Sequence, residues 1–234
     1  MIRNRINIAV SMVRYNLKII FANKFVYFML AAVAYYFLVT AIMLFSDRTP
    51  LPEDIYNTLI FPGLLIMFYP VIFNIQNDKD SRMLEIIFSI PNYRYKIYLI
   101  RFIISLLLLA VVLVFMTIVT VFTVIQVPIF YMVYQVMYPL LFLACLSFLF
   151  ATLVKNANGA AVIIVIVGLF FWIMAEPLEY SKWNIFLNPY NIPSDISYTI
   201  WTNIIFQNRL MLVTGSVVSI LWTLINLQKR EKFV

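Results

Sequence analysis

Residues Phe102–Ile125 read FIISLLLLAVVLVFMTIVTVFTVI, and this stretch, with five others like it, decides the fold. It contains no Asp, Glu, Lys, Arg or His. A helix of about 20 apolar residues, rising about 1.5 Å per residue, crosses a hydrocarbon core about 30 Å thick. Backbone groups in lipid must be satisfied within their own segment, so each stretch is expected to be a helix. The other charge-free stretches are Phe25–Phe45, Asn57–Gln76, Tyr131–Val154, Gly159–Ala175 and Leu210–Gln228.

The composition agrees with a membrane protein. The chain is 64% hydrophobic and 12% charged, with a mean hydropathy of +0.96, whereas a soluble domain is roughly 25% charged. Six helices with their connections use nearly all 234 residues, so residues 1–234 are expected to form one domain. Carriers and pumps driven by ions place ionisable groups within the membrane. The charge-free stretches therefore suggest that energy comes from another subunit.

Basic residues gather on one side of the predicted topology. Of the 17 Lys and Arg residues, 14 lie before the first stretch, between the second and third, between the fourth and fifth, or after the sixth. Arg101 belongs to this group, whereas Arg209 lies on the opposite side. The positive-inside rule then places both termini in the cytoplasm, and a bacterial inner membrane is the expected location. Because the basic residues are divided among the segments that flank the spans, a nucleic-acid partner is not expected.

The first 24 residues are expected to form an amphipathic helix at the cytoplasmic membrane surface. Basic residues Arg3, Arg14 and Lys18 lie on a different face from the apolar stripe, which suits anionic headgroups. An extended start to the first transmembrane helix is the alternative. The apolar stripe, at helical spacing, consists of Ile2, Ile6, Val10, Val13, Leu17 and Ile20.

Residues 176–209 form the longest predicted external segment. Three prolines interrupt it, and Ile196–Phe206 is apolar enough for a short helix at the outer interface. Inside the spans, Thr117, Thr120 and Thr123 are expected to bond to helix carbonyls or to a neighbouring helix. Small residues at Ala160, Ala161 and Gly168 are expected to allow close approach of helices.

Residues 77–101 are the most densely organised part of the chain outside the predicted spans. Asp78 and Asp80 can cap a helix start. Pro91 then ends the helix, since the residue before a proline avoids the α region. A short amphipathic helix is predicted, with Met83, Ile86, Ile87 and Ile90 on its apolar face and Arg82, Glu85 and Ser89 on its polar face.

This segment resembles part of the type-2 ABC transporter permeases. Ser81-Arg82-Met83-Leu84-Glu85, then Pro91, then Arg101 ten residues later, are similar to the Gly-Thr-Leu-Glu…Pro…Gly-Lys segment that follows the second span in that family. The sequence departs from the pattern at Ser81-Arg82-Met83 and at Ile100-Arg101. The interface helix, the six spans and the broken external segment are also typical of the family.

The resemblance implies a membrane subunit of a two-component ABC exporter. Two such chains, identical or related, would pair and bind two ATPase subunits, with membrane lipid around them and in some systems an accessory protein. In the family the short helix docks into the ATPase, so the resemblance implies docking roles for Arg82, Glu85, Ser89 and Pro91. A carboxylate at Glu85 would suit charge-assisted hydrogen bonds with that partner, although a solvated Glu85 is the plain alternative.

The chain itself is not expected to be an enzyme. Its four glycines cannot form a phosphate-binding loop, and it lacks His, so that no Cys/His metal cluster can be assembled. No cofactor is expected in it; ATP and magnesium would bind to the partner ATPase. Two other classes stay open: an ATP-independent carrier or channel, and a non-transporting scaffold, immunity or assembly subunit.

Overall fold

The computed structural model of the chain describes residues 14–18, 21, 24–80, 94–154 and 156–228. Within these ranges the regular structure is helical and no strand is present. Six helical spans are long and apolar enough to cross a membrane, so the chain is a multi-pass integral membrane protein with the predicted all-α fold. The helices are α2 (Phe25–Leu44), α3 (Pro52–Ile72), α4 (Asn74–Asp80), α6 (Arg94–Thr123), α7 (Ile129–Leu153), α8 (Ala157–Ala175) and α9 (Tyr198–Gln228).

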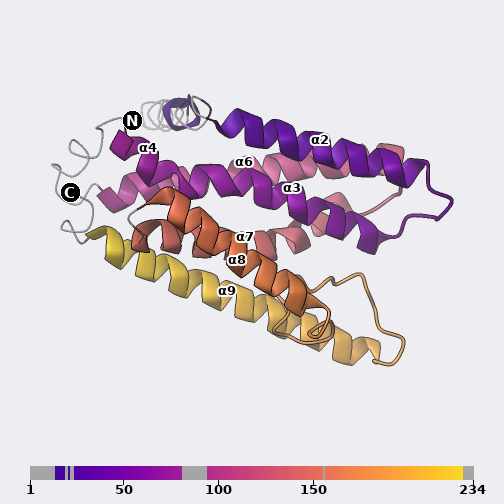
Figure 1. The fold of residues 1–234 in the computed structure, drawn as a ribbon. Helices are drawn as coiled ribbons and strands as arrows, with labels where there is room; N and C mark the ends of the chain where they lie inside the picture. The colour runs from indigo at the N-terminus through magenta and orange to yellow at the C-terminus, as the bar shows by residue number, and fades with distance from the viewer. Residues whose placement is uncertain (1–13, 19–20, 22–23, 81–93, 155, 229–234) are drawn as a thin grey trace, which may run out of the picture.

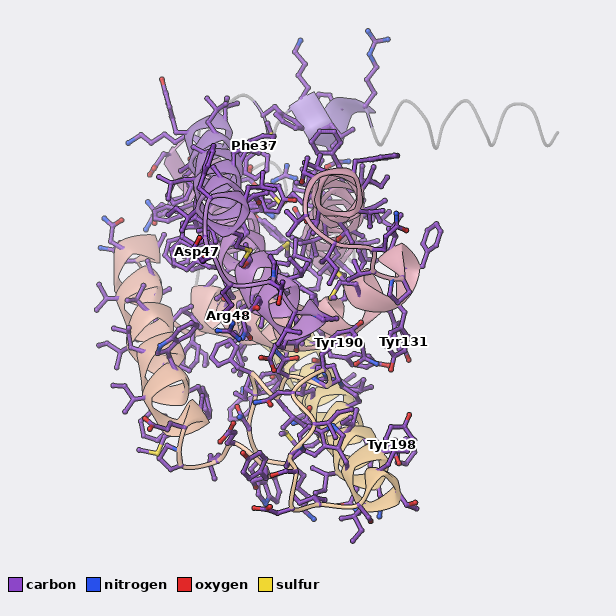
Figure 2. The ribbon with its side chains drawn as sticks, turned by 90° about the vertical axis from the view of Figure 1, so that its right-hand side faces the viewer. Phe37, Asp47, Arg48, Tyr131, Tyr190 and Tyr198 are labelled. Carbon is purple, nitrogen blue, oxygen red and sulfur yellow. The ribbon has the colours of Figure 1, made fainter. Side chains whose placement is uncertain are left out.

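The long helices run side by side and alternate in direction along the chain (Figure 1). α4 lies at one end of the bundle, where α2 begins and α9 ends, at the left of Figure 1. We call this the α4 end. The opposite end, which faces the viewer in Figure 2, carries Asp47 and Arg48 after α2 and also Tyr131 and Tyr190. We call it the Tyr190 end.

α7 is the centre of the bundle. It packs against α3, α6, α8 and α9, while α3 in turn packs against α2 and α6. A stacked pair, Phe102 and Phe148, joins α6 to α7 with ring centroids 5.1 Å apart. Gly215 lets α9 approach α7, since a Cβ at this position would lie 2.6 Å from Phe142 Cε2. The apolar core therefore lies around α7 and α3 and not around α2 or α8.

The threonines of α6 behave as the sequence predicted. Thr117 and Thr123 donate to the carbonyls of Leu113 and Val119 at 2.8 Å. Thr120 bonds to the Met116 carbonyl and also lies 2.6 Å from the hydroxyl of Tyr36 in α2. Each hydroxyl is thus satisfied without water, as an apolar surrounding requires.

Two helix boundaries differ from the sequence prediction. α9 begins at Tyr198 and is continuous, so the predicted short helix Ile196–Phe206 is its first part and not a separate element. Without a proline in this helix, nothing interrupts the backbone bonding after Phe206. α6 begins at Arg94, so the last eight residues of the predicted 77–101 segment belong to a helix of 30 residues.

Within this chain, the predicted close approach of helices is found at Ala160 and not at Gly168. Ala160 is fully buried beside Ile72 and Ile164, as close packing requires, but a Cβ added to Gly168 would meet no atom within 4 Å. α8 packs on α7 through its first half, and Gly168 faces open space. The space beside Gly168 stays unfilled because α8 packs mainly on α7 and touches α3 only slightly.

The interface helix is described only in part. Residues 14–18 are helical, and Arg14 and Lys18 are exposed. Leu17 packs against the main apolar core, which is consistent with an amphipathic segment. Arg3 lies outside the described residues, so the surface helix over residues 1–24 stays a prediction.

Candidate functional site

The predicted docking residues Arg82, Glu85, Ser89 and Pro91 lie outside the described residues. The helices that flank residues 81–93 are described. α4 ends at Asp80 and α6 begins at Arg94, and the two helices meet through side chains of opposite charge. This contact is the candidate site that the structure adds to the sequence prediction.

Arg101 and Asp78 form a buried ion pair between α6 and α4. Arg101 Nη1 lies 2.6 Å from Asp78 Oδ2 and 2.8 Å from the Asn74 side-chain oxygen. Both charged residues are 4% exposed. A guanidinium buried in a low dielectric is tolerated when a carboxylate compensates its charge and shares its hydrogen bonds. The pair therefore fixes α4 against the first turns of α6.

Tyr98 lies beside this pair and is fully buried. The guanidinium carbon of Arg101 is 5.8 Å from the centre of its ring, within the range of a cation–π contact. Among the described residues, the Tyr98 hydroxyl and Arg101 Nε have no hydrogen-bond partner. Polar groups this deeply buried are usually paired, so these two atoms are exceptions within the described part of the chain.

Two features of this region are not evident from the sequence. Arg101, the basic residue of the family-like pattern, is buried in α6, where Asp78 compensates its charge. Asp78 and Asp80 lie in the last turn of α4, and the helix that they are predicted to cap lies outside the described residues. Asp80 accepts a bond from Gln76 Nε2 at 2.7 Å. No sequence pattern pairs residues 78 and 101, since 23 positions and a helix end separate them.

α4 continues the line of α3 after a break at Phe73. The Phe73 N–H still bonds to the Tyr69 carbonyl, and the Asn77 N–H bonds to the Phe73 carbonyl at 2.8 Å. The Arg101–Asp78 pair therefore joins α4, which precedes residues 81–93, to α6, which follows them. Because α4 continues from α3, the pair also connects α3 with α6. A force applied to residues 81–93 would reach two spanning helices together.

A second buried arginine lies at the Tyr190 end. Arg209 was predicted in the external segment, but it lies within α9 and is 6% exposed. Its Nε donates to Gln135 Oε1 in α7 at 3.0 Å, and its two Nη atoms donate to Asn208 Oδ1 at 2.8 Å and to the Leu187 carbonyl at 3.2 Å. The guanidinium carbon of Arg209 lies 5.3 Å from the centre of the Tyr138 ring. These three acceptors of Arg209 are all neutral oxygens.

Arg209 and Asn208 together hold the connection between α8 and α9. Asn208 Nδ2 donates to the carbonyls of Lys182 and Asn184 at 2.8 and 2.7 Å. Tyr56 in α3 donates to the Leu187 carbonyl at 3.1 Å, the same oxygen that Arg209 reaches. Bonds from α3 and α9 therefore fix this irregular segment to the bundle.

Aromatic rings close the Tyr190 end of this network. Tyr190 lies 6.2 Å from the rings of both Tyr56 and Tyr131, and Figure 2 shows Tyr131 and Tyr190 next to each other. Burial raises the pKa of the Tyr190 phenol above its ordinary value, so the ring stays neutral at physiological pH. The rings of Tyr56, Tyr131 and Tyr190 thus form a packed support at this end.

Metal-binding groups of three or more His, Cys, Asp or Glu side chains are absent from the described parts of the chain. Comparison of the chain with protein-family models, with curated proteins and with solved structures finds no match. A function for this chain therefore has to be inferred from its own sequence and from the geometry of its two buried arginine sites.

Proposed function

We propose that this chain is the membrane subunit of an ATP-driven exporter related to the type-2 ABC permeases. Two copies, or this chain and a related one, would form the substrate pathway and bind two ATPase subunits. The α4 end would face the cytoplasm of a bacterium, with both termini on that side. The basic residues gathered near this end support that orientation through the positive-inside rule.

One observation carries the proposal. The family-like segment, with Glu85 and Pro91, joins two helices that the buried Arg101–Asp78 pair locks together. A partner that moves this segment would shift α3, α4 and α6 as a unit, because breaking the pair would leave a buried charge uncompensated. ATP-driven closure of the partner could thereby change the packing of the bundle between two states.

The buried ion pair also bears on the carrier alternative. Ion-coupled carriers place ionisable residues within their spanning helices, and Asp78 and Arg101 both lie in candidate spans. Each of the two buried charges compensates the other, and a relay that changed the charge of one partner would disrupt the pair. The pair thus suits a structural link better than a proton relay, and we keep ATP-driven export as the leading proposal.

The test is recovery of the partner from native membranes. The tagged chain would be purified in mild detergent, and mass spectrometry would identify proteins with a phosphate-binding loop. We expect an ATPase to copurify and to hydrolyse ATP. Glu85→Ala should weaken its recovery because one charge-assisted bond, about 1.5–3 kcal/mol, is lost. Glu53→Ala, at the Tyr190 end, is the matched control and should leave recovery unchanged.

Two results would contradict the proposal. The first is a purified complex without any nucleotide-binding protein, together with transport in vesicles that hold no ATP. The second is full ATPase recovery with Glu85→Ala, which would remove Glu85 from the docking surface and make Arg82 the next residue to test.

A further inference from the structure

A cleft with an apolar part and a polar part runs along one side of the bundle. The apolar part has a volume of about 430 Å³ and lies between α2 and α8, with α3 and α7 behind it. The polar part, of about 980 Å³, lies at the α4 end. Phe28 of α2 lines both parts and stacks on Phe68 and Tyr69, with ring centroids 6.0 and 5.3 Å away. The two parts therefore meet at Phe28.

The apolar part is open to its surroundings along α8. Trp172 and Leu169 line it and are 58% and 56% exposed. Gly168 also lines it, and the absence of any atom within 4 Å of an added Cβ shows unfilled space. In a membrane, open apolar space of this kind is filled by hydrocarbon, because water has no polar partner there.

The polar part carries an excess of positive charge. Lys24, at the start of α2, and Lys79 both line it and are exposed. Among the described residues that line it, the one acid is Asp80, which already accepts a bond from Gln76. Amides of Asn156 and Asn158 line the opposite wall, where α8 begins. Lysines at the level of lipid headgroups attract anionic lipids, and amides can donate to phosphate oxygens.

We propose that this cleft binds one membrane lipid with an anionic headgroup, drawn from the leaflet at the α4 end. The headgroup would lie against Lys24 and Lys79, and one acyl chain would pass Phe28 toward Trp172. Asn158 and Trp172 are 14 residues apart on α8, about 21 Å along the helix axis. One leaflet of hydrocarbon is about 15 Å thick, so the cleft has the length of a headgroup followed by one chain.

This binding site is independent of the proposed function. A scaffold, a carrier or an exporter could each hold a lipid here, and the test below uses neither ATP nor an ATPase. Its failure and the failure of the export proposal can therefore be told apart.

The experiment measures quenching of Trp172 fluorescence by brominated lipid. The full chain with Trp183→Phe and Trp222→Phe keeps Trp172 and Trp201, and Trp201 is buried, so that lipid bromine reaches chiefly Trp172. In phosphatidylcholine vesicles, a small fraction of brominated phosphatidylglycerol should quench more strongly than the same fraction of brominated phosphatidylcholine. The double variant with Lys24→Gln and Lys79→Gln should bind phosphatidylglycerol with a preference over phosphatidylcholine that is roughly 10- to 30-fold smaller.

Matched controls separate the site from the general lipid surface. Lys18→Gln with Lys182→Gln removes the same charge away from the cleft and should leave the preference unchanged. Gly168→Leu should fill the apolar part and reduce quenching, whereas Val162→Leu, at an exposed position of α8 that lines neither part, should not.

Native mass spectrometry of the unaltered chain gives a second measurement. One phosphatidylglycerol molecule should stay bound, and it should be lost from the Lys24 and Lys79 double variant. Equal quenching by the two brominated lipids would mean non-selective surface lipid and would overturn the proposal. Absent quenching together with a dimer mass would mean that a second copy covers the cleft, and this too would overturn it.

Discussion

Arg101 and Arg209 are both buried in long helices, but their charges are compensated in different ways. Arg101 faces a carboxylate, whereas Arg209 donates to amide and carbonyl oxygens of the described residues. The charge-free stretch of α6 after Arg101 is 22 residues, about 33 Å, and that of α9 after Arg209 is 19 residues, about 28 Å. Each arginine therefore lies near the edge of an apolar layer as thick as a bilayer core.

Breaking the Arg101–Asp78 pair on one side should destabilise the fold strongly. Arg101→Met removes the guanidinium that pairs with the buried Asp78, and removing one partner of a buried ion pair costs about 3–5 kcal/mol of unfolding free energy. We expect a clear fall in the Tm of the chain in detergent, followed by circular dichroism.

The matched control is the variant that removes both charges. Asp78→Leu with Arg101→Met should recover most of the lost Tm, because an apolar pair can replace a buried ion pair at little cost. A double variant as unstable as Arg101→Met would show that the charge of the pair is not the source of its stabilisation.

At the scale of elements, α2 is held to the bundle by few polar contacts. Its buried residues include Tyr36, whose hydroxyl donates to the Met116 carbonyl at 2.6 Å and bonds with Thr120 in α6. Many of its other large side chains are exposed. A helix packed in this way depends more on single contacts than α7, which four helices surround.

Tyr36→Phe should therefore loosen α2. The variant loses the bond to Met116, and interhelical bonds in membranes contribute about 0.5–1.5 kcal/mol. Amide hydrogen exchange in the peptide that contains Phe25–Leu44 should become faster, while exchange in α7 should stay the same.

Tyr35→Phe is the control for this change. Tyr35 packs its ring against Phe61 at 4.6 Å, and phenylalanine keeps that contact. Faster exchange with Tyr35→Phe than with Tyr36→Phe would show that the bond of the Tyr36 hydroxyl to Met116 is not what holds α2 in place.

At the scale of the whole molecule, both ends of the bundle are held by buried polar groups while the middle is apolar. The connection after α8 is fixed by Asn208 and Arg209, and α4 is fixed by Arg101. The even number of spans returns the chain to the end at which α2 begins (Figure 1). The bundle thus has two distinct ends, which labelling can assign to the two sides of the membrane.

Cysteine labelling should place the two ends on opposite sides. Cys145 is buried, so it should not react and need not be replaced. A membrane-impermeant maleimide should label Ser46→Cys and Ser194→Cys in intact cells, because both positions lie on connections at the Tyr190 end. Ser81→Cys should react only after the membrane is permeabilised. Labelling of Ser81→Cys in intact cells would contradict the proposed orientation.

The sequence alone determined the all-α class and the existence of six spans, because charge-free stretches of about 20 residues have one stable form in lipid. It also predicted the internal bonds of Thr117 and Thr123, which are local to one helix. It could not locate the ends of α6 and α9, since helices continue past the hydrocarbon wherever no proline or partner stops them.

Only the tertiary structure decided which residues meet across the bundle. Arg101 and Asp78 are 23 residues apart, and Arg209 and Gln135 are 74 apart. Nothing in an apolar sequence distinguishes a face that packs on protein from one that meets lipid, because both surroundings are equally apolar. The open space at Gly168, the cleft beside α8 and the burial of the two arginines all depend on that choice of neighbours.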